Sequence, residues 1–364
     1  MKVAIVCDWL TGIGGAERVV LELHKMYPKA PIYTSQYSPN KIDWFKDADV
    51  RTGWLQKLPV GLKKFLPVFR AWYFSHLDLS GYDLVISSSG AEAKGLKTGP
   101  NTKHVCYCHS PTHYYWSRYE DYLANPGFGR LDWLARIGLK VLLGPMRRWD
   151  YKAAQRPDYI IANSNYSKDQ IQKYYKREST VIHPPVDVER FAGKVEEPRR
   201  GFITAGRQTP YKKIDLAVQA CTELNLPLVV LGSGPDHKLL QKTAGKSITF
   251  LRGKSDQELA HYFQTSLAFI FPGIDDFGIV AVEALAAGTP VIAYKAGGAL
   301  DYVEPGKTGE FFNEPTTDSL ARALDKFNPQ AFSNSQIQKS TSRFSALNFH
   351  KNFSDLLKRL KLNV

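Results

Sequence analysis

The sequence predicts an α/β protein built from two doubly wound domains, each with a parallel sheet covered by helices on both faces. Short apolar, β-branched runs recur between segments of helical spacing, a pattern typical of parallel sheets whose strands are joined by helices. The chain has 364 residues and a hydrophobic content of 43%, which can fill two cores of ordinary size. Between two series of such runs lies "GKVEEPRRG" (193–201), a polar stretch that offers no face to bury.

The first domain is expected over residues 1–192, followed by a linker over 193–200. Its strands are predicted in five apolar runs: "KVAIVC" (2–7), "DLVISSS" (83–89), "HVCYCH" (104–109), "YIIANS" (159–164) and "TVIHP" (180–184).

The second domain is expected over 201–345, with helices at about 215–224 and 278–287 and a C-terminal helix over 346–364 that could pack back on the first domain. Ligands of open α/β sheets bind beyond the carboxyl ends of the strands, so two such domains can place both strand-end crevices on one interdomain cleft. Its strands are predicted in a second set of runs: "GFITAG" (201–206), "PLVVLGSG" (227–234), "SITFLRG" (247–253), "LAFIFPG" (267–273) and "PVIAY" (290–294).

Charge and cysteine content narrow the class of protein. The net charge is +13, with 27 Lys/Arg against 18 Asp/Glu in residues 1–190, which suits phosphates, nucleic acid or an anionic membrane surface. The first apolar run stops at Asp8, too early for a signal peptide, and no run is long enough to span a membrane, so we expect a cytoplasmic enzyme or a peripheral membrane protein. Four scattered cysteines predict reduced thiols instead of a disulfide framework.

The strongest motif is "FPGIDDFGIVAVEALAAGTPVIAY" (271–294), which runs from strand to turn to helix. Asp275 precedes the predicted helix and Glu283 lies about one turn inside it. The backbone N–H groups at the helix start, together with the positive end of the helix dipole, make an anion site between these two acids. A plainer interpretation is that the aspartates only cap the helix and that Glu283 is solvated. The N–H groups in question belong to Phe277, Gly278 and Ile279.

A second motif, "AGRQTPYKKID" (205–215), directly follows the first strand of the second domain. Arg207 and Lys212 lie five residues apart across a turn that contains Pro210, which lets two cations converge on one diphosphate. The alternative is a solvated basic loop.

"DDFGIVAVEALAAGTPVIA" resembles the signature of the retaining glycosyltransferases of family 4, which have the GT-B fold of two Rossmann-like domains. The resemblance implies that Asp275, where the family usually has Glu, holds the donor sugar and that Glu283 holds the nucleotide ribose. It assigns the N–H groups of 277–279 to sugar and phosphate. It also implies that Arg207 and Lys212, after Gly206, bind the β-phosphate of a nucleotide sugar.

Two further turns carry weaker signals. "VLGSGPD" (230–236) and "FLRGKSDQEL" (250–259) each end a predicted strand, and turn formation alone explains their glycines. In the family the second loop holds the nucleobase, largely through its backbone. The resemblance therefore points to Arg252, Gly253 and Lys254.

The first domain carries a histidine candidate in "YCHSPTHYYW" (107–116). The His and Cys residues here do not have zinc-ligand spacing, so no metal is expected. The resemblance implies that His109 faces the donor sugar, and a core histidine is the alternative.

"DWLTGIGGAERVV" (8–20) has the glycines of a dinucleotide-binding turn, but Glu17 stands at the third glycine position. The resemblance instead assigns Gly14 and Gly15 to the glycine-rich turn of the acceptor-side domain, closing over the sugar diphosphate.

The stretch 54–74 is basic and aromatic and contains no acid. Apolar residues at helical spacing, including Phe69, Trp72 and Tyr73, form one stripe while Arg70 and two lysines point elsewhere. This favours equally an interfacial helix touching anionic lipid, which would place the enzyme at the inner face of the membrane, and an ordinary helix packed on its own domain.

The resemblance implies a retaining hexosyltransferase, and no metal is expected, since fixed cations would stabilise the leaving diphosphate. The run from 276 looks most like bacterial mannosyltransferases of surface polysaccharide assembly, so GDP-mannose is the first donor expected and UDP-glucose the next. The acceptor is a hydroxyl of a glycan or a lipid-linked sugar. A nucleotide-sugar epimerase of the same shape, a catalytically silent sugar-binding relative and a basic nucleic-acid-binding protein are the alternatives, although no nucleic-acid module is recognised.

Overall fold

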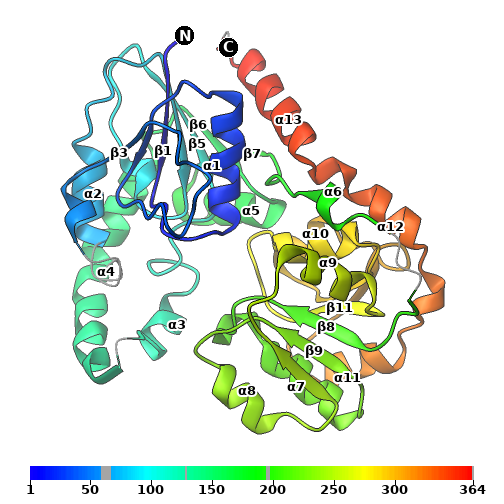
Figure 1. Ribbon diagram of the computed structural model, residues 1–364. Helices are drawn as coiled ribbons and strands as arrows, with labels where there is room; N and C mark the ends of the chain where they lie inside the picture. Colours follow the sequence, from blue (N-terminus) through cyan, green and yellow to red (C-terminus); the bar gives the residue numbers. More distant parts are fainter. Residues whose placement is uncertain (59–66, 128, 194–196, 363–364) are drawn as a thin grey trace. The chain divides into compact units, whose positions relative to one another are not determined.

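The chain divides into two compact units. Unit 1 consists of residues 1–185 and 349–364, and unit 2 of residues 186–348 (Figure 1). Each unit holds one parallel sheet, so the predicted α/β class with two doubly wound domains is confirmed. Within the part of the chain that is described, no helix is both long and apolar enough to cross a membrane. The structure, a computed structural model, describes residues 1–58, 67–127, 129–193 and 197–362.

Unit 1 is built on a seven-stranded sheet of order β3-β2-β1-β4-β5-β6-β7, in which every neighbouring pair is parallel. The five predicted strands are present. β2 and β3 were not predicted, because three residues are too few to show a period. The strands are β1 (Val3–Cys7), β2 (Ile32–Thr34), β3 (Val50–Thr52), β4 (Leu84–Ser89), β5 (Lys103–Cys108), β6 (Tyr159–Ala162) and β7 (Thr180–Val181).

Helices cover the sheet of unit 1 and complete its core. The C-terminal helix packs on this unit, where Phe349, Phe353 and Leu357 join Ile5 and Ile86 in one buried cluster. Burying these side chains stabilises the return of the chain to unit 1 by roughly 1.5–3 kcal/mol each. The helices are α1 (Gly15–Met26), α2 (Pro67–Ser75), α3 (Tyr119–Ala124), α4 (Asp132–Ala154), α5 (Asn165–Tyr175) and α13 (Ala346–Arg359).

Unit 2 repeats the architecture with a six-stranded parallel sheet of order β10-β9-β8-β11-β12-β13. β13 was not predicted. Its strands are β8 (Phe202–Ala205), β9 (Leu228–Leu231), β10 (Ile248–Leu251), β11 (Ala268–Phe271), β12 (Val291–Tyr294) and β13 (Gly309–Phe312). Its helices are α6 (Val188–Phe191), α7 (Ile214–Glu223), α8 (His237–Thr243), α9 (Asp256–Gln264), α10 (Ile279–Ala286), α11 (Thr317–Asp325) and α12 (Asn334–Ser340).

The start of unit 2 lies earlier than the predicted start of the second domain. Residues 186–192, assigned above to the first domain, belong to unit 2. The Val186 N–H donates to the Phe344 carbonyl oxygen at 2.8 Å, and the Phe191 ring packs on Phe263 at 5.9 Å between centroids. Residues 194–196 of the predicted linker lie outside the described residues.

The basic aromatic stretch 54–74 forms a 3₁₀ turn, Trp54–Lys57, and then α2, while residues 59–66 lie outside the described part. The predicted stripe does not hold for α2, since Tyr73 is buried but Phe69 and Trp72 are exposed. Arg70 turns inward because Glu92 accepts from its Nε at 2.7 Å.

Candidate active site

The loop after β8 lies at the carboxyl edge of the unit 2 sheet. Gly206 has φ of +141°, a region that favours glycine, and the Arg207 that follows is exposed. The Gln208 side chain donates to the Gly232 carbonyl oxygen at 3.0 Å, and its Oε1 lies 2.6 Å from His237 Nδ1. Burial, together with the charge of Arg252, lowers the pKa of His237 below its ordinary value.

Two glycines let the loops after β8 and β9 touch backbone to backbone. A Cβ on Gly232 would stand 2.1 Å from the Gly206 carbonyl oxygen, and one on Gly234 would stand 2.1 Å from the Gln208 carbonyl oxygen. Side chains do not fit at either place. The glycines of "VLGSGPD" therefore pack these loops closely, the turn role that the sequence left open.

The loop after β11 meets Lys212 of the β8 loop. A Cβ on Gly273 would lie 2.7 Å from the Lys212 Cα, so the two backbones are in close contact. Lys212 Nζ forms an ion pair with Asp275 Oδ2, and their side chains are only 19% and 13% exposed. β8 and β11 are neighbours in the sheet, and this brings Lys212 and Asp275 together although they lie 63 positions apart in the sequence.

The turn between Asp275 and α10 is held from both sides. The Gly298 N–H donates to the Asp275 carbonyl oxygen at 2.9 Å, and the Phe277 ring is buried 5.5 Å from that of Tyr302. Gly278, with φ of +90°, is the N-cap of α10. The first N–H groups of a helix have no acceptor within that helix, and residues 277–279 stand at the start of α10; that they bind an anion stays a prediction.

Glu283 lies in the middle of α10 and is buried, with 6% of its surface exposed. It follows the helix start by about one turn, as its spacing predicts. A solvated Glu283, the plainer alternative, is therefore wrong.

The loop after β10 holds the residues matched to nucleobase binding. Arg252 is exposed, and Gly253 takes the left-handed conformation with φ of +62°. Lys254 Nζ pairs with Glu258 Oε1 of α9 at 2.7 Å, and Glu258 also completes the capping box of that helix with Ser255. The Lys254 ammonium is thus engaged within its own loop.

His109 directly follows β5 in unit 1 and is half-buried. The His109 ring nitrogen Nε2 lies 2.8 Å from Ser88 Oγ of β4. The backbone N–H of His109 donates to the Ser89 carbonyl oxygen, and its backbone carbonyl oxygen accepts from Ser167 Oγ at 3.1 Å. These bonds fix the imidazole at the carboxyl ends of β4 and β5.

The glycine turn predicted in unit 1 connects β1, the neighbour of β4, to α1. Gly14 is the N-cap of α1, and Gly15 is the first residue of the helix.

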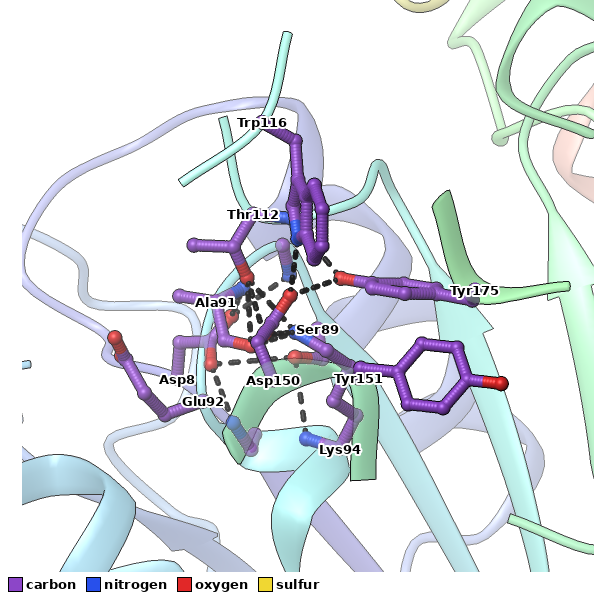
Figure 2. Close-up of polar contacts among 12 residues, drawn as sticks. Asp8, Ser89, Ala91, Glu92, Lys94, Thr112, Trp116, Asp150, Tyr151 and Tyr175 are labelled. Atoms are coloured by element: carbon purple, nitrogen blue, oxygen red, sulfur yellow. Dashed lines mark hydrogen bonds and ion pairs between the residues drawn. The ribbon is translucent and has the colours of Figure 1, made fainter. Parts of the chain in front are cut away.

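Asp8, which sequence reasoning missed as a functional residue, organises the same edge of unit 1. Its carboxylate accepts from the N–H groups of Gly90, Ala91 and Ala93 at 2.8, 3.0 and 2.8 Å (Figure 2). The loop after β4 is thereby tied to the end of β1. A polar residue placed directly after a buried strand was the available signal.

A buried ion pair, also missed, anchors the loop after His109. Lys94 Nζ lies 2.7 Å from Asp150 Oδ1 of α4, and their side chains are 1% and 0% exposed. Figure 2 shows Thr112, Trp116 and Tyr175 around Asp150, and each donates to this carboxylate at 2.7–2.9 Å. Burial opposes the charge on Lys94, but Asp150, together with the nearby Cys108 and Asp8, raises the pKa of the ammonium above its ordinary value.

Candidate metal ligands are not gathered anywhere in the described part of the chain: no group of three or more His, Cys, Asp or Glu side chains is arranged to hold an ion. The four cysteines are buried and unbridged.

Two family models match consecutive parts of the chain. The model described as Glycosyltransferase Family 4 matches residues 13–190, and the model described as Glycosyl transferases group 1 matches 185–341. The first covers most of unit 1 and the second most of unit 2, including the Lys212 and Asp275 loops.

Relatives at low identity agree with these models. The human α-1,3/1,6-mannosyltransferase ALG2 is 24% identical over 87% of this chain and 85% of its own. The GDP-mannose-dependent α-(1-6)-phosphatidylinositol monomannoside mannosyltransferase of Mycolicibacterium smegmatis is 27% identical over 46% of this chain and 52% of its own. The chain spans less than half the length of several other curated relatives.

Among solved structures, Anabaena HepE in complex with UDP superposes with a TM-score of 0.72 at 18% identity, covering 99% of this chain and 100% of that one. At this identity the likeness concerns the fold. The two matched models, the mannosyltransferase relatives and the paired parallel sheets lead to one conclusion: the chain is a glycosyltransferase of family 4 with the GT-B fold.

Proposed function

We propose that the chain transfers mannose from GDP-mannose, with retention of anomeric configuration and without a metal, to a hydroxyl of a glycan or lipid-linked acceptor. The observation that carries the proposal is the contact of Lys212 with Asp275 beside the start of α10. This contact puts a cation, a carboxylate and helix N–H groups at one edge of the sheet, the groups that a sugar diphosphate needs. UDP-glucose is the second donor considered.

The proposed chemistry needs charge stabilisation where the diphosphate leaves. As the bond from the sugar to phosphate breaks, negative charge grows on the phosphate oxygens, and Lys212, Arg207 and the N–H groups of 277–279 would face it. Asp275 would then accept hydrogen bonds from sugar hydroxyls, and Glu283 from the ribose. Attack from the same face, with the departing phosphate oxygen taking the acceptor proton, would retain configuration.

The mannose donor is supported by the names of two relatives, one a mannosyltransferase and one GDP-mannose-dependent. Peripheral membrane contact is supported by the exposed aromatic cluster of Trp54, Phe69 and Trp72, whose rings meet edge-on at 5.9 and 6.3 Å from Trp54. Aromatic rings at a surface are typical of membrane interfaces.

A thermal shift panel with UDP, GDP, UDP-glucose and GDP-mannose tests the donor, and NMR of the product tests retention. GDP-mannose should give the largest shift, and turnover should persist in EDTA. Lys212→Ala should lower kcat/KM by about 10²–10³-fold, while Lys242→Ala, which changes an exposed lysine in the last turn of α8, serves as the matched control. Equal turnover in the two variants would refute the role of Lys212. Change of GDP-mannose without any acceptor would instead indicate an epimerase.

A further inference from the structure

The N-terminal half of α4 presents an apolar face to solvent. Trp133, Ile137 and Val141 recur every four residues along one side, with Leu134 beside them, and they are 58%, 54%, 67% and 51% exposed. These four residues are called the outer face of α4. The buried residues of the helix, by contrast, all lie at or beyond Met146.

The N-terminal half of α4 is fastened to the short helix α3. Arg136 donates to the carbonyl oxygens of Leu123 and Ala124 at 3.0 and 2.9 Å, which fastens it to the short helix α3. Gly138 lies inside this half and Pro145 ends it, and both residue types disfavour a helix interior. Helices gain most of their stability by packing an apolar face. The outer face is exposed to solvent and gains little of this packing from the described part of unit 1.

The charges beside the outer face select the kind of surface. Residues 129–149 contain five Lys/Arg and one acid, Asp132. Lys140 and Arg148 are exposed next to the apolar residues. Two copies of the chain joined through this face would bring like charges together, whereas an anionic lipid surface would be attracted to them.

We propose that the outer face of α4 inserts into the interface of a membrane containing anionic phospholipid. The exposed aromatic cluster of Trp54, Phe69 and Trp72 lies on the same side of unit 1, since Ala71 of α2 and Met146 in the C-terminal half of α4 belong to one buried cluster and Figure 1 shows both helices on that side. Trp133 lies at headgroup depth, and Ile137 and Val141 enter the acyl boundary. The proposal rests on the proposed function only in giving the enzyme access to a lipid-linked acceptor.

Vesicle co-sedimentation tests this surface without any substrate. Wild type should bind phosphatidylcholine vesicles that contain phosphatidylglycerol and bind pure phosphatidylcholine weakly. Ile137→Glu/Val141→Glu should reduce binding by about tenfold or more, because two charges replace residues that enter the bilayer. The matched control is Leu239→Glu/Leu347→Glu, which changes two residues that are 62% and 78% exposed in unit 2.

Fluorescence quenching tests the same surface if the Ile137→Glu/Val141→Glu variant folds poorly. Brominated lipid should quench the tryptophan fluorescence of wild type, and Trp133→Phe should remove part of that quenching. Equal vesicle binding by the two Glu variants, or unchanged quenching in Trp133→Phe, would overturn the proposal. So would a wild-type dimer that Ile137→Glu/Val141→Glu converts to monomer. Thermal shifts with GDP-mannose are scored separately, so failure of the donor proposal and failure of the membrane proposal give different results.

Discussion

Replacing Lys94 by Met should strongly destabilise unit 1. The ammonium and the Asp150 carboxylate are fully buried and 2.7 Å apart, so the change leaves a charge in the interior without its counter-ion. Breaking a buried pair in this way costs about 3–5 kcal/mol. Because Thr112, Trp116 and Tyr175 still donate to Asp150, we expect the lower end, about 3 kcal/mol, out of the roughly 5–15 kcal/mol that stabilise a typical domain.

Urea unfolding followed by tryptophan fluorescence measures this loss in unit 1 alone, since all seven tryptophans lie within residues 9–149. Lys103→Met is the control: it removes the exposed pair with Asp158, worth about 0–1 kcal/mol. Adding Asp150→Asn to Lys94→Met should recover part of the stability, because the remaining charge is then removed as well. A Lys94→Met protein that unfolds at the same urea concentration as Lys103→Met would refute the reasoning.

Three further predictions concern a loop of unit 2, a buried histidine of unit 1 and the turn before α1. Gly232→Ala should displace the Gly206 loop, since the new Cβ would lie 2.1 Å from the Gly206 carbonyl oxygen. The variant should therefore bind GDP-mannose more weakly in a thermal shift assay. Gly81→Ala is the control and should leave binding unchanged, because a Cβ on Gly81 would meet no atom within 4 Å. Burial lowers the pKa of His104 to about 3, so on acidification the unfolded chain takes up this proton before the folded chain does. The free energy of unfolding should therefore fall by about 1.4 kcal/mol for each unit that the pH drops from 6.5 to 3. The same acid titration of His104→Gln should be flatter, and parallel curves would contradict this. Gly15→Trp should reduce the rate of sugar transfer while the melting temperature stays close to that of wild type. A loss of transfer that is accompanied by a large fall in melting temperature would count against a role of this turn in the site.

Much of the fold could be predicted because its strands are continuous runs of buried residues that begin with apolar side chains. β4, with six buried residues, shows this clearly. β2 and β3, with three residues each, pair only through their place in the sheet, and no local pattern marks them. The return of α13 to unit 1 depends on contacts across most of the chain.

The candidate site divides in the same way. Lys212 and Asp275 lie in the loops that follow β8 and β11, and these strands are neighbours in the sheet, which brings the two loops together. Lys94 follows Glu92 in a polar turn that resembles a solvated loop, and its burial depends on Asp150, which lies on a helix 56 positions further on. Charge alone does not indicate whether a lysine is exposed or paired in the interior.

The two units use a common device to fix their sheet edges. In unit 1, the Asp8 carboxylate after β1 accepts from three N–H groups of the loop after β4, and in unit 2, the Gln208 amide after β8 donates to the Gly232 carbonyl oxygen. Ordering one residue of backbone costs about 1–2 kcal/mol. Here folding meets that cost, so a ligand arriving at either edge does not have to order these loops itself. Removal of the Gln208 amide leaves the charges of Arg207 and Lys212 in place. If GDP-mannose then binds more weakly, the loss of affinity measures the contribution of loop preorganisation separately from that of charge.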